Sequence, residues 1–203
     1  MTISTYGTLK SAIADFLNRD DLTAVIPTFI SLAEAQMNRD IRHWRMEERA
    51  TLTLSSQYTA LPADWLQTTS LSLNNQRLEY VSRDNMLERA EQTSVYTGNP
   101  DSYTLTGGEL EVYPRPSVSV DATLIYTQKI PALSDGAPTN WVLAYFPEVY
   151  LYGSLLHSAP YLQDDARLQV WAPIYAASVT QVNADSLRSK AGTNMRLKIK
   201  GLS

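Results

Sequence analysis

The apolar residues near the start of the chain recur at helical spacing. Between Thr5 and Asn18, one face of a helix would carry Leu9, Ile13, Phe16 and Leu17. After a turn-prone segment at 18–21, a longer stripe has members three or four residues apart: Ile26, Ile30, Ala33, Met37, Ile41 and Trp44. Polar residues fill its opposite side, which we expect to face solvent: Ser31, Glu34, Asn38, Arg42 and Arg45. The pattern predicts two helices, the second packing through one face with Pro27 in its first turn.

The middle of the chain alternates apolar and polar residues, which predicts antiparallel strands over 51–54, 66–73 and 121–130. The last of these strands has one apolar face with Ala122, Leu124 and Tyr126. A turn at 75–76 would align two apolar pairs across a first hairpin, Leu73 with Leu78 and Leu71 with Tyr80.

Gly107-Gly108 is a stronger turn signal and predicts a second hairpin. Its apolar pairs would be Leu105 with Leu110 and Tyr103 with Val112. Its solvent face would hold Thr104, Thr106, Glu109 and Glu111. Between the two hairpins, Ser82 is a predicted N-cap for a short helix over 85–91.

Helical spacing returns after the loop at 131–138. Pro147 is placed to open a helix that we expect to end before Pro160. Asp164-Asp165 would cap a further helix, kinked at Pro173, whose apolar face holds Leu168, Trp171, Tyr175, Val179 and Val182.

Together these elements predict an α+β fold. The N- and C-terminal helices (1–48 and 139–193) form one discontinuous bundle, and a small antiparallel β region (49–138) is inserted between them. The last segment, 194–203, alternates Met195, Leu197 and Ile199 with Arg196, Lys198 and Lys200. We expect it to be an arm that adds a strand to another subunit; the alternatives are pairing with the chain's own sheet and disorder.

Composition narrows the classes of function. The 203 residues are 44% hydrophobic and 19% charged, which is ordinary for a folded domain. A net charge of −4 argues against a protein that binds nucleic acid electrostatically. No apolar run approaches the ~20 residues that cross a bilayer, and no secretory signal is expected. The lack of cysteine excludes disulfides and thiol catalysis.

No pattern in the sequence predicts a catalytic, cofactor or metal site. His43 and His157 are far apart and lack metal-ligand spacing. Gly153-Ser154 lacks the second glycine of a nucleophile elbow. Glu109 and Glu111 have the arrangement of paired carboxylates but are better explained as a solvated strand face. Asp164-Asp165 have the residue type of a cation site but are explained by helix capping. From the absence of any such pattern we expect no enzyme activity.

The arginines at 39, 42 and 45 are the one basic cluster on the predicted long helix. They have three interpretations: contact with phosphate, a solvated helix face, or contact with an acidic partner. The last two are favoured over phosphate.

Several strings, in order along nearly the whole chain, resemble phage head-to-tail adaptors, the portal-binding neck or tail tubular protein A-like family. They are 33–42 on the long helix, 61–65 before the first hairpin, 98–103, 107–110 and 114–116 around the second, then 130–134, 139–141, 147–155 and 159–167 with Trp171. Their order and spacing carry the resemblance, not any one string.

The resemblance implies a structural virion protein of the neck or tail, assembled in the host cytoplasm. Copies would form a dodecameric ring on the portal protein, extend the channel through which double-stranded DNA passes, and offer a platform to a tail nozzle or tail-tube protein. The expected portal or subunit interface holds Met195, Leu197, Ile199, Arg196, Lys198, Lys200, Arg39, Arg42 and Arg45. The alternatives are another neck or tail ring component and a virion-associated peptidoglycan hydrolase.

Overall fold

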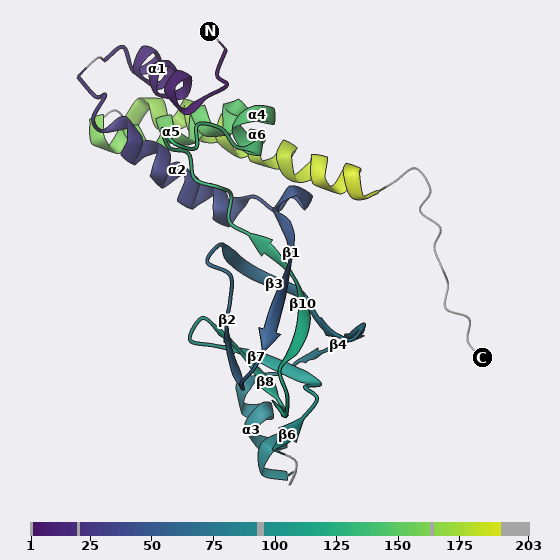
Figure 1. The fold of residues 1–203 in the computed structure, drawn as a ribbon. Coiled ribbons are helices and arrows are strands. Elements are labelled where there is room, and N and C mark those ends of the chain that lie inside the picture. The colour runs from purple at the N-terminus through teal and green to yellow at the C-terminus, as the bar shows by residue number, and fades with distance from the viewer. Residues whose placement is uncertain (1, 20, 93–95, 163–164, 192–203) are drawn as a thin grey trace. The chain divides into compact units, whose positions relative to one another are not determined.

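The computed structural model describes residues 2–19, 21–92, 96–162 and 165–191 (Figure 1). The chain divides into two compact units. One, the helical unit, is built from the two ends of the chain, up to Met46 and from Ile130; the other, the β unit, spans Glu47–Lys129. Helices and antiparallel sheets are both present, so the predicted α+β class is confirmed.

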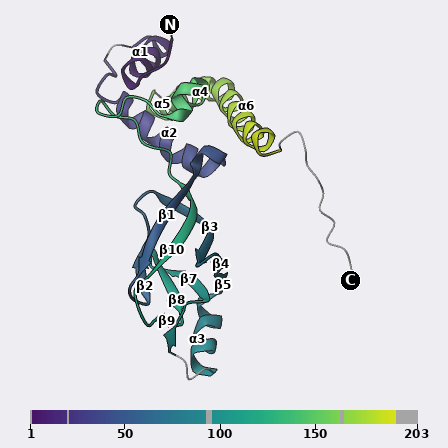
Figure 2. The same ribbon diagram turned by 45° about the vertical axis from the view of Figure 1, so that its right-hand side comes forward.

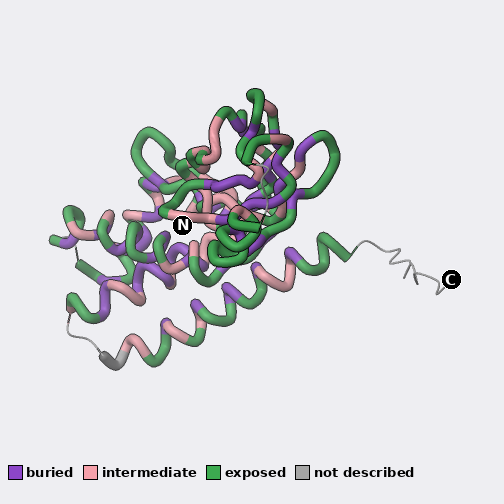
Figure 3. The backbone as a smooth tube through the Cα atoms, turned by 90° about the horizontal axis from the view of Figure 1, so that it is seen from below, coloured by how far each residue is buried: buried purple, intermediate pink, exposed green. Residues whose placement is uncertain are grey.

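The helical unit contains α1 (Tyr6–Leu17), α2 (Ile26–Asp40), the 3-10 turn η1 (Trp44–Met46), α4 (Trp141–Tyr145), α5 (Pro147–Leu162) and α6 (Asp165–Lys190). The central helix is α5, which contacts α1, α2, α4 and α6. Gly153 allows this close packing, because a Cβ there would lie 3.2 Å from the Tyr175 ring and 3.3 Å from Ala33 Cβ. Along α6, buried positions recur at helical spacing: Trp171, Tyr175, Val179 and Val182 (Figure 3).

The β unit contains β1 (Glu47–Leu54), β2 (Tyr58–Ala60), β3 (Trp65–Leu73), β4 (Gln76–Arg77), β5 (Glu79–Tyr80), α3 (Arg83–Gln92), β6 (Thr97–Gly98), β7 (Ser102–Thr106), β8 (Glu109–Tyr113), β9 (Arg115–Pro116) and β10 (Val120–Gln128). The larger sheet has the order β1-β10-β3-β4, and a second has the order β2-β8-β7-β5 (Figure 2). Both sheets contribute to one core, which includes Leu54, Leu71, Leu110, Val112 and Leu124.

Most predicted strands and turns are confirmed. The Gly107-Gly108 hairpin has the expected pairs, Leu105 with Leu110 and Tyr103 with Val112. Both glycines have positive φ (63° and 84°), as a two-residue hairpin turn requires. Ser82 Oγ accepts a hydrogen bond from Asn85 N at the start of α3. Ala122, Leu124 and Tyr126 of β10 are buried as predicted.

The first hairpin differs from its predicted register. Asn74 and Asn75, both at positive φ, form the turn, so Leu73 pairs with Gln76 and Leu78 N donates to Leu71 O. Asparagine tolerates left-handed backbone, which favours Asn-Asn over Asn-Gln as the turn pair. The shift moves the pairing by two residues, so Leu71, Leu73 and Leu78 keep their face. The predicted pairing of Tyr80 with Leu71 is wrong, because Tyr80 lies in β5, pairs with β7 and is 59% exposed.

Four predicted exposures or boundaries in the helices are wrong. Phe16 is 51% exposed because the face of α1 that packs is narrower, with Leu9, Ile13 and Leu17. Glu34 is buried instead of solvated. The stripe of α2 stops at Asp40, since Ile41 is extended and Trp44 lies in η1. Helix α5 continues through Pro160 to Leu162, because the buried residues Leu155, Ser158 and Ala159 hold its last turns despite the hydrogen bond that proline removes.

Other predictions about the C-terminal half remain open. Helix α6 includes Pro173, and whether it kinks there stays a prediction. The proposed cap at Asp164 and the arm at 194–203 lie outside the described residues.

Candidate interface on the helical unit

Glu111 is the first functional candidate that the structure reassigns. It was expected on the solvent face of the second hairpin, but it is 4% exposed. Its Oε2 lies 2.7 Å from Arg83 Nη1, and its carboxylate also accepts from Thr106, Gln57 and Tyr58. Arg83 neutralises this carboxylate and three neutral donors orient it, so it anchors β8 to its neighbours.

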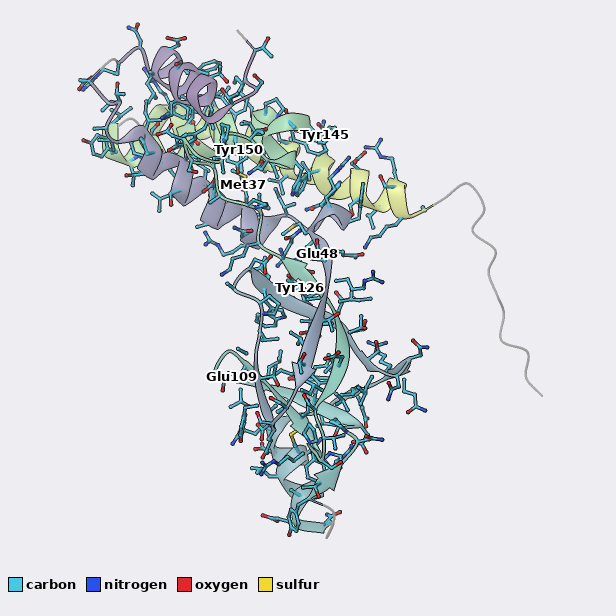
Figure 4. All side chains as sticks on the ribbon, viewed as in Figure 1. Met37, Glu48, Glu109, Tyr126, Tyr145 and Tyr150 are labelled. Carbon is cyan, nitrogen blue, oxygen red and sulfur yellow. The ribbon has the colours of Figure 1, made fainter. Side chains whose placement is uncertain are left out.

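Glu109, the other carboxylate of the predicted pair, lies exposed at the hairpin tip (Figure 4). Thr104, expected beside it on the solvent face, is buried at 2% exposure. The two glutamates therefore have different environments. In the part of the chain that the structure describes, no group of three His, Cys, Asp or Glu side chains has the arrangement of a metal site.

His43 is a buried residue that fixes the segment after α2. Its ring stacks on Trp141 at 4.8 Å between centroids. Its Nδ1 accepts a hydrogen bond from Arg45 N at 3.2 Å, which leaves Nε2 to face Asp185 Oδ2 at 3.4 Å. Burial lowers the pKa of His43 below its ordinary value, with Asp185 opposing that shift. The neutral, Nε2-protonated ring is the form that suits these partners.

A polar row on α6 holds the same segment. Asn183 Oδ1 accepts from Arg42 N at 2.8 Å, and Ser186 Oγ accepts from Trp44 N at 2.9 Å. Asn183 also donates to Asp40 O, the last residue of α2. The bond to Asp40 O satisfies a carbonyl that the end of α2 leaves free, and the other two satisfy N–H groups of the segment that follows the helix. Residues 40–45 are therefore held in a defined conformation by α6.

The three arginines predicted as an interface have three different environments. Arg39 is exposed in the last turn of α2, where a cation complements the helix dipole. Arg42 Nη1 donates to Asn38 O at 3.0 Å and to Ile41 O at 2.6 Å, so it caps the end of α2. Only Arg45 presents its guanidinium to aromatic rings.

Arg45 lies between two exposed aromatic side chains. Its Cζ is 4.6 Å from the Trp44 ring centroid and 4.4 Å from that of Tyr145. Trp44 is 38% exposed and Tyr145 is 59% exposed. Figure 4 labels Tyr145 at the end of α4. We call these three residues the Trp44–Arg45–Tyr145 stack. Trp, Tyr and Arg are the residue types that dominate binding energy at protein interfaces.

The sequence predicted Arg45 but not the residues that position it. Tyr145, Asn183, Asp185 and Ser186 are about a hundred or more residues away along the chain. Asn183, Asp185 and Ser186 follow the predicted apolar stripe of the last helix, whereas Tyr145 lies on α4, a short helix that the sequence analysis did not predict. Their polar side chains carried no motif by which to choose them.

The part of the chain described by the structure contains no helix with the length and apolarity needed to cross a membrane. Comparison with family models matches residues 4–197 to the SU10 adaptor protein family. No curated protein matches the chain. The match covers almost the entire sequence, so this chain belongs to the SU10 adaptor protein family, and its resemblance to phage head-to-tail adaptors is confirmed. That membership indicates a phage adaptor protein.

Proposed function

We propose that copies of this protein form a ring on the phage portal, extend the DNA channel and provide the platform to which the tail attaches. The family match over residues 4–197 carries this proposal, because it includes the elements of both units in order. Identical copies in a closed ring must join through a heterologous interface, in which two different surfaces of the subunit meet. The weakly acidic chain, with a net charge of −4, suits a conduit that does not retain passing DNA.

Two regions of the chain fit the contacts that such a ring needs. The Trp44–Arg45–Tyr145 stack offers a rigid aromatic surface, and the Arg45 guanidinium can donate to a partner carboxylate without losing its ring contacts. With Arg39 and Arg42, it forms the proposed contact to an acidic partner. The second region is the C-terminal arm, residues 194–203, with its apolar Met195, Leu197 and Ile199 and its basic Arg196, Lys198 and Lys200.

Deletion of residues 194–203 tests the role of the arm. We expect the deleted protein to keep its circular dichroism spectrum and unfolding midpoint, because every described element precedes the arm. We expect it to lose attachment to purified portal rings in a co-sedimentation assay. Unchanged attachment would remove the arm from the interface.

Arg45→Ala tests the stack, with Arg19→Ala as the matched control. Arg19 is exposed, whereas Arg45 is half-buried, and Arg19 pairs with Asp21 at 2.6 Å on a surface loop. Removing an aromatic-stacked arginine from an interface costs about 2 kcal/mol or more, equivalent to an affinity loss of about thirtyfold. We expect Arg45→Ala to weaken portal attachment and Arg19→Ala to leave it unchanged. Equal effects of the two substitutions would show that the stack is not part of the portal interface.

A further inference from the structure

Strand β3 has one edge that is largely unpaired. Its other edge pairs with β10 from Trp65 to Leu73. On the open side, β4 has only two residues, which pair with Ser72 and Leu73, and Leu78 N reaches Leu71 O. Among the strands that the structure describes, none pairs with the open edge over residues 65–70. An unpaired edge of this length exposes backbone donors and acceptors that another strand can use.

A groove runs along this edge. It has a volume of about 360 Å³, and β3 residues 65–69 form one side. Tyr80, Tyr103 and Leu105 contribute to the lining, with the two tyrosine rings edge-to-face at 5.6 Å. Tyr80 is 59% exposed. The groove thus combines a backbone edge with aromatic and apolar side chains, the two features that strand-addition sites use for affinity and specificity.

Several features that usually protect an edge strand are missing here, while two register irregularities interrupt the pairing of β3 with β10, between Ser70 and Thr68 and between Gln67 and Trp65. Residues 65–71 of β3 contain no charged residue, proline or glycine. The other edge strand of the same sheet, β1, begins with Glu47, Glu48 and Arg49. Arg77 reaches the edge only at one point, where its Nη2 lies 3.4 Å from Thr69 O. An uncharged edge beside an apolar groove is expected to be covered in the assembled state.

We propose that this groove binds residues 194–200 of a second copy of the chain as an added β-strand. The alternation of Met195, Leu197 and Ile199 with basic residues gives that segment one apolar face for the groove and one polar face for solvent. Twelve residues follow Ala191, the last described residue, and seven of them in extended form span roughly 23 Å, enough for the open part of β3.

The net charge of the β unit as a whole favours a basic partner, and the groove lining itself contains one charged residue, Arg77. Residues 194–203 contain three basic residues and no acidic one. The β unit, residues 47–129, contains eleven Asp and Glu against six Lys and Arg. A strand on one copy and a groove on the next are two different surfaces, so the contact is heterologous and repeats around a ring.

Peptide binding tests the groove directly. A fluorescent peptide of residues 192–203 is titrated with a chain that ends at residue 191. We expect saturable binding, and a peptide of the same composition with the apolar and basic residues regrouped into two blocks should bind at least about tenfold more weakly, because it lacks one apolar face. Equal binding of the two peptides would show attraction by charge alone and overturn the proposal.

Tyr80→Ala and Tyr96→Ala form a matched pair of groove and control variants. Both tyrosines belong to the β unit and are well exposed (59% and 64%), but only Tyr80 lines the groove. We expect Tyr80→Ala to weaken peptide binding about tenfold or more and Tyr96→Ala to leave it unchanged. The opposite order, or no effect of either, would overturn the assignment.

Sedimentation distinguishes a second copy from the chain's own tail. At concentrations above the Kd of the peptide, the full-length chain should self-associate, and the chain ending at residue 191 should remain monomeric. A full-length chain that stays monomeric and no longer binds added peptide would show that its own tail occupies the groove, contrary to the proposal. The role of this contact in a ring rests on the proposed function. The contact itself is measured by peptide binding and the proposed function by attachment to the portal, so failure of one experiment can be distinguished from failure of the other.

Discussion

Glu34 shows how a single buried carboxylate organises the helical unit. Its Oε1 accepts from Leu133 N at 2.7 Å, in the loop before α4, and from Tyr150 Oη at 3.2 Å, on α5. Asn140 Nδ2 donates to the same tyrosine oxygen at 2.6 Å. Tyr150 is fully buried in this unit, as is Met37 on the same helix as Glu34 (Figure 4). One acid thus links α2, α5 and the connecting loop.

Two substitutions at Glu34 separate its hydrogen bonds from its charge. We expect Glu34→Ala to lower the free energy of unfolding by about 1–3 kcal/mol, because the Leu133 N–H and Tyr150 hydroxyl lose their acceptor. Glu34→Gln keeps an acceptor oxygen and removes the buried charge, so it should be much closer to wild type. Urea unfolding of both variants at neutral pH measures the difference, and equal losses would contradict a role for the acceptor.

The contribution of Glu34 to stability should depend on pH, and the direction of that dependence follows from its pKa. Burial raises the pKa of Glu34 above its ordinary value near 4.5, while the two hydrogen bonds oppose that shift. The folded state therefore holds the proton more tightly than the unfolded state, and wild-type stability is lost as pH rises from the ordinary value through the folded pKa. Glu34→Gln should gain stability relative to wild type over that window. A gain in the stability of Glu34→Gln relative to wild type as pH falls would contradict this direction of the pKa shift.

At the scale of elements, Gly153 determines how closely α5 approaches α2 and α6. A methyl group at this position would meet Tyr175 and Ala33 at 3.2 and 3.3 Å. We expect Gly153→Ala to lower the free energy of unfolding by about 1–3 kcal/mol through overpacking. Gly7→Ala in α1 is the control, since an added Cβ there would lie 3.9 Å from its nearest neighbour, Thr5 Oγ1. Because alanine has the higher helix propensity, this variant should be more stable than wild type by about 0.5–1 kcal/mol. Thermal unfolding of both measures this, and destabilisation by both would contradict the packing argument.

The elements also show what the sequence can and cannot predict. Strand alternation and the Gly107-Gly108 turn were sufficient for the second hairpin, because both are local signals. Burial of Glu34 and Glu111 was missed because their partners, Leu133, Tyr150 and Arg83, are distant in sequence. Periodicity assigns a polar residue to the solvent face, and only tertiary structure provides the donors that let it be buried. The same reason hid Tyr145 and Asn183 from the candidate interface.

At the scale of the whole chain, the β unit begins and ends on neighbouring strands. Glu47 of β1 pairs with Thr127 of β10, so the insertion leaves and returns at one place. The unit has its own core across both sheets. We expect residues 47–129, expressed alone, to fold cooperatively, with β-type circular dichroism and a single unfolding transition. A disordered fragment would mean that this unit depends on the helices for its stability.

The central claim is that this adaptor attaches to a portal as a stoichiometric ring, and native mass spectrometry tests it most directly. The purified protein is mixed in increasing amounts with its cognate portal ring, and the mass of the complex is followed to saturation. The account predicts a chain that is monomeric at low concentration by itself and a saturated complex with one copy per portal subunit. A portal that binds its other partners but never gains this chain would contradict the account.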